Sequence, residues 1–93
     1  MKLDRGVAIV GAGMTKFGRS PDLSSRELFV DAFSKAVGSI DRNFEKKMIQ
    51  ALFLGNFTSD LFEHQGHTAP IMADWVGLCP APATRVEGAC ASG

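Results

Sequence analysis

VEGACASG, residues 86–93, is the stretch around which the rest of the sequence is organised. Thr84, Arg85 and Val86 favour extended structure, and the small residues around Cys90 let backbone or ligand approach the sulfur closely. If a helix begins at or just after Cys90, its free N–H groups and its dipole favour the thiolate form. A cysteine on such a strand-to-helix turn is a candidate covalent nucleophile. The alternative is a buried, inert cysteine, and the spacing alone leaves both open.

Three apolar runs predict the strands of an α/β fold. Residues 5–14 contain the continuous run VAIV, residues 51–57 begin with ALFL, and residues 83–89 lead into Cys90. Continuous runs, as opposed to alternating ones, are typical of central strands that are covered on both faces. We therefore expect these three segments to share one sheet.

Gly11 and Gly13 end the first of these runs and raise the alternative of a dinucleotide-binding loop. In a Gly-x-Gly-x-x-Gly motif the third glycine would stand at position 16, which is Lys16 in this chain, and a long loop follows in place of a helix. We therefore interpret the segment as a strand that ends in a flexible glycine loop.

The clearest helix is predicted over residues 24–37. The segment opens with Ser24-Ser25-Arg26-Glu27, which fits a capping box: the Ser24 hydroxyl accepts a bond from the backbone and Glu27 reaches back. Apolar residues then recur at helical spacing. They predict one packed stripe, made of Leu28, Phe29, Ala32, Phe33 and Ala36.

A second helix is predicted over residues 68–76, with Thr68 as its cap and Pro70 in the first turn, where a missing N–H does no harm. A shorter helix is predicted over residues 44–49. Strands and helices therefore alternate, which predicts a mostly parallel sheet with right-handed crossovers. Cys90 then lies at the carboxyl end of a strand, where open α/β sheets bind their ligands.

Composition bounds the class of protein. The chain has 93 residues, enough for one small domain, and its 10 basic side chains balance 10 acidic ones. A zero formal charge gives no support for a nucleic-acid or anionic-membrane partner. No apolar run approaches the ~20 residues that span a bilayer, and the first residues do not resemble a signal peptide. With two cysteines, Cys79 and Cys90, we expect a cytoplasmic protein with reduced thiols.

Polar residues before the second helix raise the alternative of a metal site. The predicted loop over residues 58–66 contains Asp60, Glu63 and His64, and His67 follows. The spacing of the two histidines occurs in metal sites, but a third ligand at firm spacing is not evident, so we expect no metal. Cys79 is expected to have a structural role.

The residues around Cys90 resemble the nucleophile motif of the thiolase superfamily. The resemblance also covers residues 7–18 (VAIVGAGMTKFG), residues 65–78 and the lead-in PAPATRVE at residues 80–87. It is closest to archaeal and bacterial acetyl-CoA acetyltransferases and to the thiolase-like domain of sterol carrier and lipid-transfer proteins. It implies that residues 1–93 are an incomplete amino-terminal domain of the layered α-β-α-β-α thiolase fold, ending at the nucleophile motif.

The resemblance implies acyl-CoA chemistry at Cys90. In that chemistry the cysteine takes an acyl group as a thioester, and a second acyl-CoA attacks it; the reverse reaction cleaves a β-ketoacyl-CoA. Coenzyme A thioesters would be substrates, with no bound cofactor. Family members also use a Gly-His-Pro histidine, a second cysteine in Cys-x-Gly and an oxyanion-binding Asn or His. None of these motifs occurs in the 93 residues, so we expect no turnover by this chain alone.

Two alternatives stand beside the enzyme. Lipid-transfer relatives imply a non-catalytic protein that binds acyl-CoA or lipid, and an inactive fragment is the third possibility.

The resemblance further implies a homodimer or homotetramer in which polar groups of residues 58–66 order a loop of the partner subunit. Archaeal relatives imply a complex with a hydroxymethylglutaryl-CoA synthase and a small zinc-ribbon/OB-fold protein.

Overall fold

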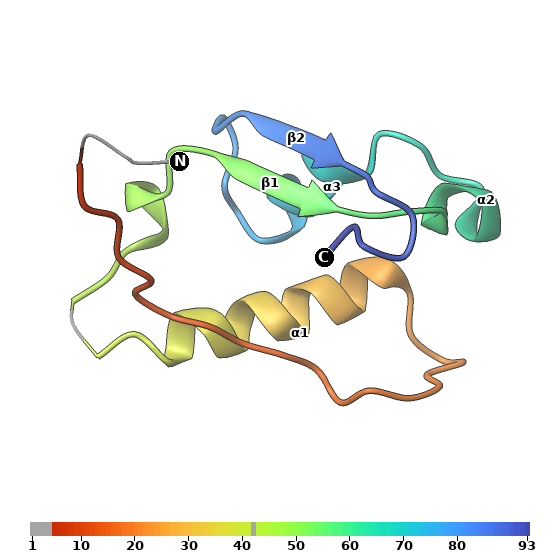
Figure 1. Ribbon diagram of the computed structural model, residues 1–93, viewed down its shortest axis with the longest axis horizontal. Helices are drawn as coiled ribbons and strands as arrows, with labels where there is room; N and C mark the ends of the chain where they lie inside the picture. Colours follow the sequence, from red (N-terminus) through yellow and green to blue (C-terminus); the bar gives the residue numbers. More distant parts are fainter. Residues whose placement is uncertain (1–4, 42) are drawn as a thin grey trace.

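The computed structural model describes residues 5–41 and 43–93. Its elements are arranged around one short parallel sheet (Figure 1). In chain order they are α1 (Ser25–Gly38), a 3-10 helix η1 (Lys46–Met48), β1 (Leu52–Gly55), α2 (Ser59–Glu63), α3 (Thr68–Trp75) and β2 (Ala83–Val86).

β1 and β2 form a parallel pair, with Leu52 opposite Ala83 and Gly55 opposite Val86. The backbone of the flanking residues extends the ladder, because the Asn56 N–H donates to the Val86 carbonyl at 3.1 Å. Parallel strands need a crossover connection, and α2 and α3 lie within it. The observed architecture is therefore α/β with a parallel sheet, as the alternating pattern predicts.

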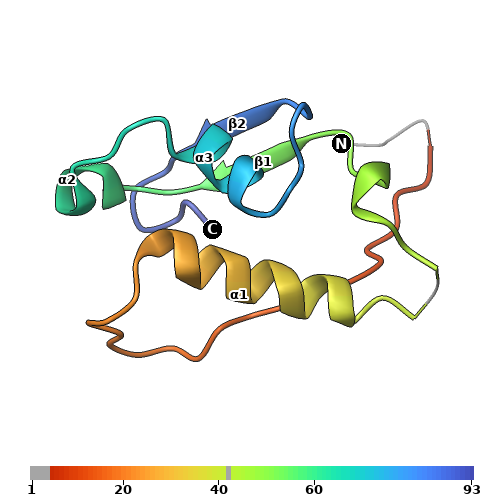
Figure 2. The ribbon, with the colours of Figure 1, turned by 180° about the vertical axis from the view of Figure 1, so that it is seen from behind.

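α3 is the packing centre of the molecule. It contacts both strands on one side and α1 on another, an arrangement that is seen from behind in Figure 2. Most of its residues are apolar, and the Met72 side chain is only 2% exposed. The buried residues are Leu54, Thr68, Ala69, Met72, Ala73, Val76 and Leu78. Burial of this kind contributes about 1.5–3 kcal/mol for each large apolar side chain, so the crossover and its sheet hold most of the core.

α1 confirms the predicted helix and the Ser24 half of its capping box. The Ser24 hydroxyl oxygen accepts a hydrogen bond from the Glu27 N–H at 3.3 Å, and the same hydroxyl lies 3.3 Å from the Glu27 carboxylate. The apolar stripe of α1 is partly buried and includes the stacked rings of Phe29 and Phe33, whose centres are 6.1 Å apart. α1 therefore covers α3 and the core with one face only.

Residues 5–14 do not form the predicted strand. They run past η1 and then, from the glycines on, along α1 in both views (Figures 1 and 2), and Val7 and Ile9 are 79% and 92% exposed. A continuous apolar run becomes a strand only where a neighbouring strand satisfies its backbone. Within residues 5–41 and 43–93, β1 and β2 pair only with each other. The run therefore joins neither edge of the two-stranded sheet.

The two glycines after this run have a packing role against α1. A Cβ atom on Gly13 would overlap the backbone nitrogen of Ala36, and one on Gly11 would lie 2.7 Å from the Ala36 carbonyl oxygen. The Ala12 N–H also donates to the Ser39 hydroxyl at 3.0 Å. The glycines thus let the segment lie directly on the end of α1. A loop, not a helix, follows them, as the sequence predicts.

Several boundaries differ from prediction. The strand expected over 51–57 ends at Gly55, the one over 83–89 ends at Val86, and the helix expected over 44–49 is the 3-10 turn η1. The predicted loop over 58–66 contains α2, and Thr68 does not cap α3. His67, with a positive φ of 59°, precedes α3, while the Thr68 hydroxyl is buried without a hydrogen-bond partner among the described residues.

Candidate active site around Cys90

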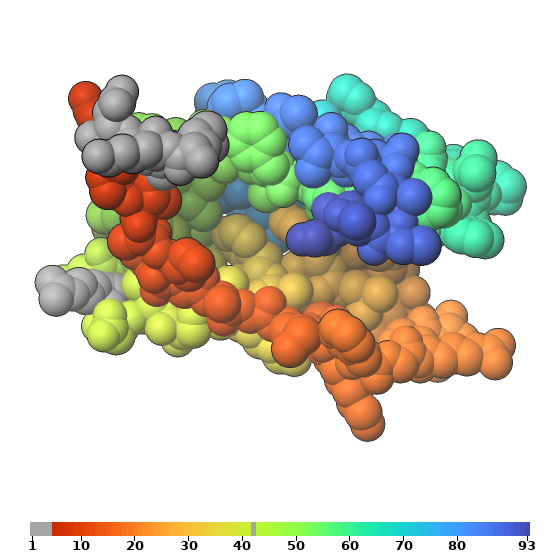
Figure 3. Space-filling view, in the orientation of Figure 1, coloured from red at the N-terminus to blue at the C-terminus, as the bar shows by residue number. Residues whose placement is uncertain are grey.

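Cys90 lies in a tight turn that follows β2. The chain leaves the strand at Val86 and folds back, with the Ala91 N–H donating to the Gly88 carbonyl at 2.9 Å and the Ser92 N–H donating to the Ala89 carbonyl at 3.1 Å. Figure 3 shows this carboxyl-terminal part of the chain, in dark blue, on the surface of the molecule. Cys90 is exposed, so the alternative of a buried cysteine is wrong.

Two side chains hold the turn from inside. The Ser92 hydroxyl accepts a hydrogen bond from the Gly88 N–H at 3.0 Å and donates one to the Ala89 carbonyl at 2.6 Å. The Glu87 carboxylate accepts a hydrogen bond from the Ala89 N–H. Ala89 itself has a positive φ of 49°, which favours a sharp reversal. The turn is therefore closed by side chains as well as by backbone.

The expected helix after Cys90 is not observed. Residues 88–92 form the turn just described, and no helix begins at Cys90 within the part of the chain that the structure describes. An α-helical hydrogen bond joins residues four apart, and only three residues of this sequence follow Cys90. The turn also uses the N–H groups of Gly88 and Ala89 internally, so they are not open to a ligand oxyanion.

The turn packs against the end of β1. The backbone of Ser92 lies so close to Gly55 that a Cβ atom there would overlap the Ser92 carbonyl oxygen and lie 3.0 Å from its carbon. The turn that contains Cys90 therefore lies against the carboxyl ends of both parallel strands, the edge at which the sequence predicts a ligand site.

Arg85 ties the two strand ends together and was not singled out from the sequence. Its guanidinium donates to the carbonyl oxygens of Asn56 (3.2 Å from Nε) and Phe57 and pairs with Asp60 at 3.3 Å. The Arg85 guanidinium beside Asp60 holds the pKa of that carboxyl below its usual value of 3.8. The signal for this contact in the sequence is a charged residue, Arg85, within a short strand segment, where it needs a partner when it is partly buried.

The polar residues of the possible metal site have separate partners or are exposed. Asp60 pairs with Arg85, and the Glu63 carboxylate accepts a hydrogen bond from the Ser25 N–H at 3.2 Å. His64 and His67 are exposed and both have positive φ. Residues 5–41 and 43–93 contain no group of three or more metal-ligating side chains.

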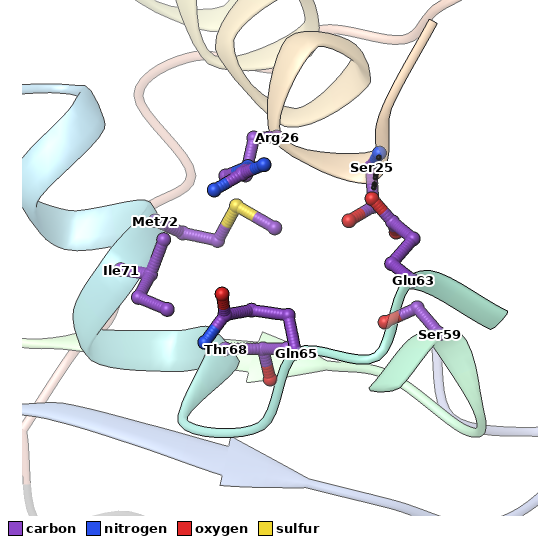
Figure 4. Close-up of a pocket in the computed structure, with 8 residues that line it drawn as sticks. All are labelled: Ser25, Arg26, Ser59, Glu63, Gln65, Thr68, Ile71 and Met72. Carbon is purple, nitrogen blue, oxygen red and sulfur yellow. Dashed lines mark hydrogen bonds between the residues drawn. The ribbon is translucent and has the colours of Figure 1, made fainter. Parts of the chain in front are cut away.

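A small cavity between α1, α2 and α3 is too small for a substrate. Its volume is about 10 Å³, the size of a single water molecule. Figure 4 shows the Glu63 carboxylate pointing toward Ser25 at its edge, with Met72 and Gln65 also lining it. The cavity therefore belongs to the packing of the helices.

Cys79, the second cysteine, is also exposed and lies in the connection between α3 and β2. Its sulfur is 3.9 Å from the Asp74 carboxylate. This contact is a weak hydrogen bond, because a thiol is a poor donor. The structural role of Cys79 stays a prediction.

Known proteins similar to this chain are thiolases. Acetyl-CoA acetyltransferase of Methanocaldococcus jannaschii is 46% identical over 89 residues, and that of Methanothermobacter thermautotrophicus is 42% identical over 90 residues; each match covers 96% of this chain. Benzoylsuccinyl-CoA thiolase subunit BbsB of Thauera aromatica is 35% identical over 97 residues, which cover the whole chain. The predicted resemblance to a segment of the thiolase superfamily is confirmed.

The chain spans about a fifth of the length of these relatives, with 22% of the first and 23% of the other two matched. No family model matches it. The described residues form a two-stranded α/β unit, and the layered thiolase fold stays a prediction. In the described part of the chain, no helix has the length and apolar character needed to cross a membrane.

Proposed function

We propose that this segment belongs to an acyl-CoA acyltransferase of the thiolase type and that Cys90 is its nucleophile. The observation that supports this most is the exposed Cys90, set in a closed turn at the carboxyl edge of a parallel pair. That geometry occurs in a segment 46% identical to an acetyl-CoA acetyltransferase. Coenzyme A thioesters are the proposed substrates.

The proposed chemistry has two steps. The Cys90 thiolate attacks the carbonyl carbon of an acyl-CoA; a new C–S bond forms, the old C–S bond breaks, and coenzyme A leaves as a thiol after taking up a proton. A base removes a proton from the α-carbon of a second acyl-CoA, and the resulting carbanion attacks the acyl group. The Cys90 thiolate then leaves, and a β-ketoacyl-CoA is released.

These residues supply the nucleophile and its support, and not the rest of the machinery. The polar groups nearest the turn are already engaged, because Glu87 accepts from Ala89 and Arg85 is bound to the end of β1. The base and the oxyanion donors must come from elsewhere in an active protein. We therefore propose that the 93-residue chain by itself has no thiolase turnover.

Cys90→Ala in the full-length gene product tests the proposal. Acetoacetyl-CoA cleavage with coenzyme A should fall by at least about 10³-fold, since the covalent route is lost. Cys79→Ala is the matched control and should keep activity, because both thiols are exposed but only Cys90 is proposed to react. Normal turnover by Cys90→Ala would exclude the proposed nucleophile. Binding of acyl-CoA without any turnover by the unchanged protein would favour the acyl-CoA-binding or lipid-transfer alternative.

We further propose a cytoplasmic homodimer or homotetramer. Large apolar side chains on the surface support association: Phe62 is 80% exposed and Phe53 is 69% exposed. The complex with a hydroxymethylglutaryl-CoA synthase and a zinc-ribbon/OB-fold protein stays a prediction. Sedimentation of the purified protein and co-purification from its source test the two assemblies separately.

A further inference from the structure

The hydroxyl of Ser92 occupies the middle of the Cys90 turn. It uses its acceptor toward the Gly88 N–H at 3.0 Å and its donor toward the Ala89 carbonyl at 2.6 Å. These partners lie before Cys90 in the sequence, while Ser92 lies after it, so the two bonds close a loop around the cysteine. One hydroxyl thereby satisfies two backbone groups and limits how far the turn can open.

Gly55, at the end of β1, lies directly against the backbone of the same turn. A Cβ atom at this position would overlap the Ser92 carbonyl oxygen and lie 3.0 Å from the Ser92 carbonyl carbon, and both are backbone atoms. No change of side-chain rotamer can relieve such an overlap. The glycines with positive φ are Gly18 and Gly77, so the backbone conformation of Gly55 does not itself require glycine. The requirement at Gly55 comes from the approach of the turn.

We propose that Ser92 and Gly55 are positioning residues for Cys90: Ser92 closes the turn, and Gly55 admits its backbone against β1. The sulfur is then held relative to both parallel strands, although its own chain leaves only β2. This inference rests on the proposed function, because it assigns a purpose to the fixed place of the cysteine. A displacement of about 1 Å in a reacting group costs up to about 10²-fold in rate, so such support has a measurable value.

Two measurements on the full-length gene product separate positioning from general stability. The first is kcat and KM for acetoacetyl-CoA cleavage. The second is the rate at which limiting iodoacetamide labels Cys90 and Cys79, read by mass spectrometry. A loosened turn places the sulfur wrongly for a large substrate but leaves it open to a small reagent. General unfolding would instead raise the labelling of both cysteines.

Ser92→Ala and Gly55→Ala should each lower kcat by at least about tenfold, with KM within about twofold. Labelling of Cys90 should stay equal or rise, and labelling of Cys79 should not change. Ser92→Thr keeps the hydroxyl and should restore most of kcat. Gly38→Ala is the matched glycine control, because a Cβ atom there meets nothing within 4 Å, and it should behave like the unchanged protein.

Wild-type kcat in Ser92→Ala, or equal losses in Ser92→Ala and Ser92→Thr, would overturn the role of Ser92. Wild-type kcat in Gly55→Ala would overturn the role of Gly55. If Gly55→Ala unfolds, the Ser92 pair still decides whether the turn is positioned by its hydroxyl. Activity of Cys90→Ala would instead reject the proposed function, and that result is distinct from any of these.

Discussion

Residues 52–86 and residues 5–14 are both rich in apolar side chains, yet only the first region is packed. In the strand–helix–strand unit, Leu54 and Met72 are 8% and 2% exposed, whereas Ile9 in the amino-terminal segment is 92% exposed. The two regions differ in whether a neighbouring strand pairs with them. β1 pairs with β2 and packs against α3, whereas the amino-terminal run pairs with neither strand and meets α1 and residues 39–40 at its glycines. Apolar composition therefore selects a strand only where a second strand completes it.

The largest expected effect breaks the packed region. Met72→Ala should destabilise the chain by about 2–5 kcal/mol, because it removes a fully buried side chain and leaves a cavity. Ile9→Ala, the matched change in the exposed segment, should alter stability by less than about 0.5 kcal/mol. Urea unfolding followed by circular dichroism compares the two. Equal effects would show that the two regions do not differ in packing as described.

A smaller effect concerns the Arg85 clamp that joins the two strand ends. Arg85 holds the pKa of Asp60 below 3.8 in the folded chain, so the pair stabilises the fold above that pH. As pH falls through the lowered pKa, Asp60 takes up a proton and this stabilisation is lost. Asp60→Asn should therefore lower Tm at pH 6 and bring it closer to that of the unchanged chain at pH 3.

Melting curves at several pH values between 3 and 6 measure this difference. The contrast between the two proteins isolates Asp60 from the other acidic groups, which titrate in both. A Tm difference that stays constant over the whole range would contradict the pairing of Asp60 with Arg85.

The smallest expected effect compares the two cysteines in the 93-residue chain. Both are exposed, and neither lies at the start of a helix within residues 43–93. We expect iodoacetamide to label them at rates within about threefold of each other, because helix-terminus effects of about 1 kcal/mol are missing at both. A much faster reaction of Cys90 would show activation by the turn itself. In the full-length gene product, a large preference for Cys90 stays the prediction.

The parts predicted well from sequence are those with local causes. The capping box of Ser24 and Glu27 needs only four neighbouring residues, and the apolar face of α3 is visible in its own composition. The place of Cys90 after the carboxyl end of a strand also follows from pattern, whereas its exposure was left open. Predictions that depend on distant partners were less successful. Residues 5–14 pair with neither β1 nor β2, and the contact of their glycines with the end of α1 is not visible in their own pattern.

The Arg85 clamp and the contact between Gly55 and Ser92 were missed for the same reason. Each joins residues that are far apart in sequence and meet only when β1 and β2 pair in their observed register. A single sequence shows a glycine and an arginine near strand ends, and it does not show what they face. The place of Cys90 after a strand was thus predictable, and the contacts that hold its turn were not.

The parallel register also sets an order in time during synthesis. Leu52 pairs with Ala83, about thirty residues later, and a ribosome adds about 5–20 residues per second, so β1 waits about 2–6 seconds for its partner. The ladder can close only after the whole crossover has emerged. β2 is therefore the later of these two strands to join, and the turn that contains Cys90 forms on a surface that α3 has already had time to build.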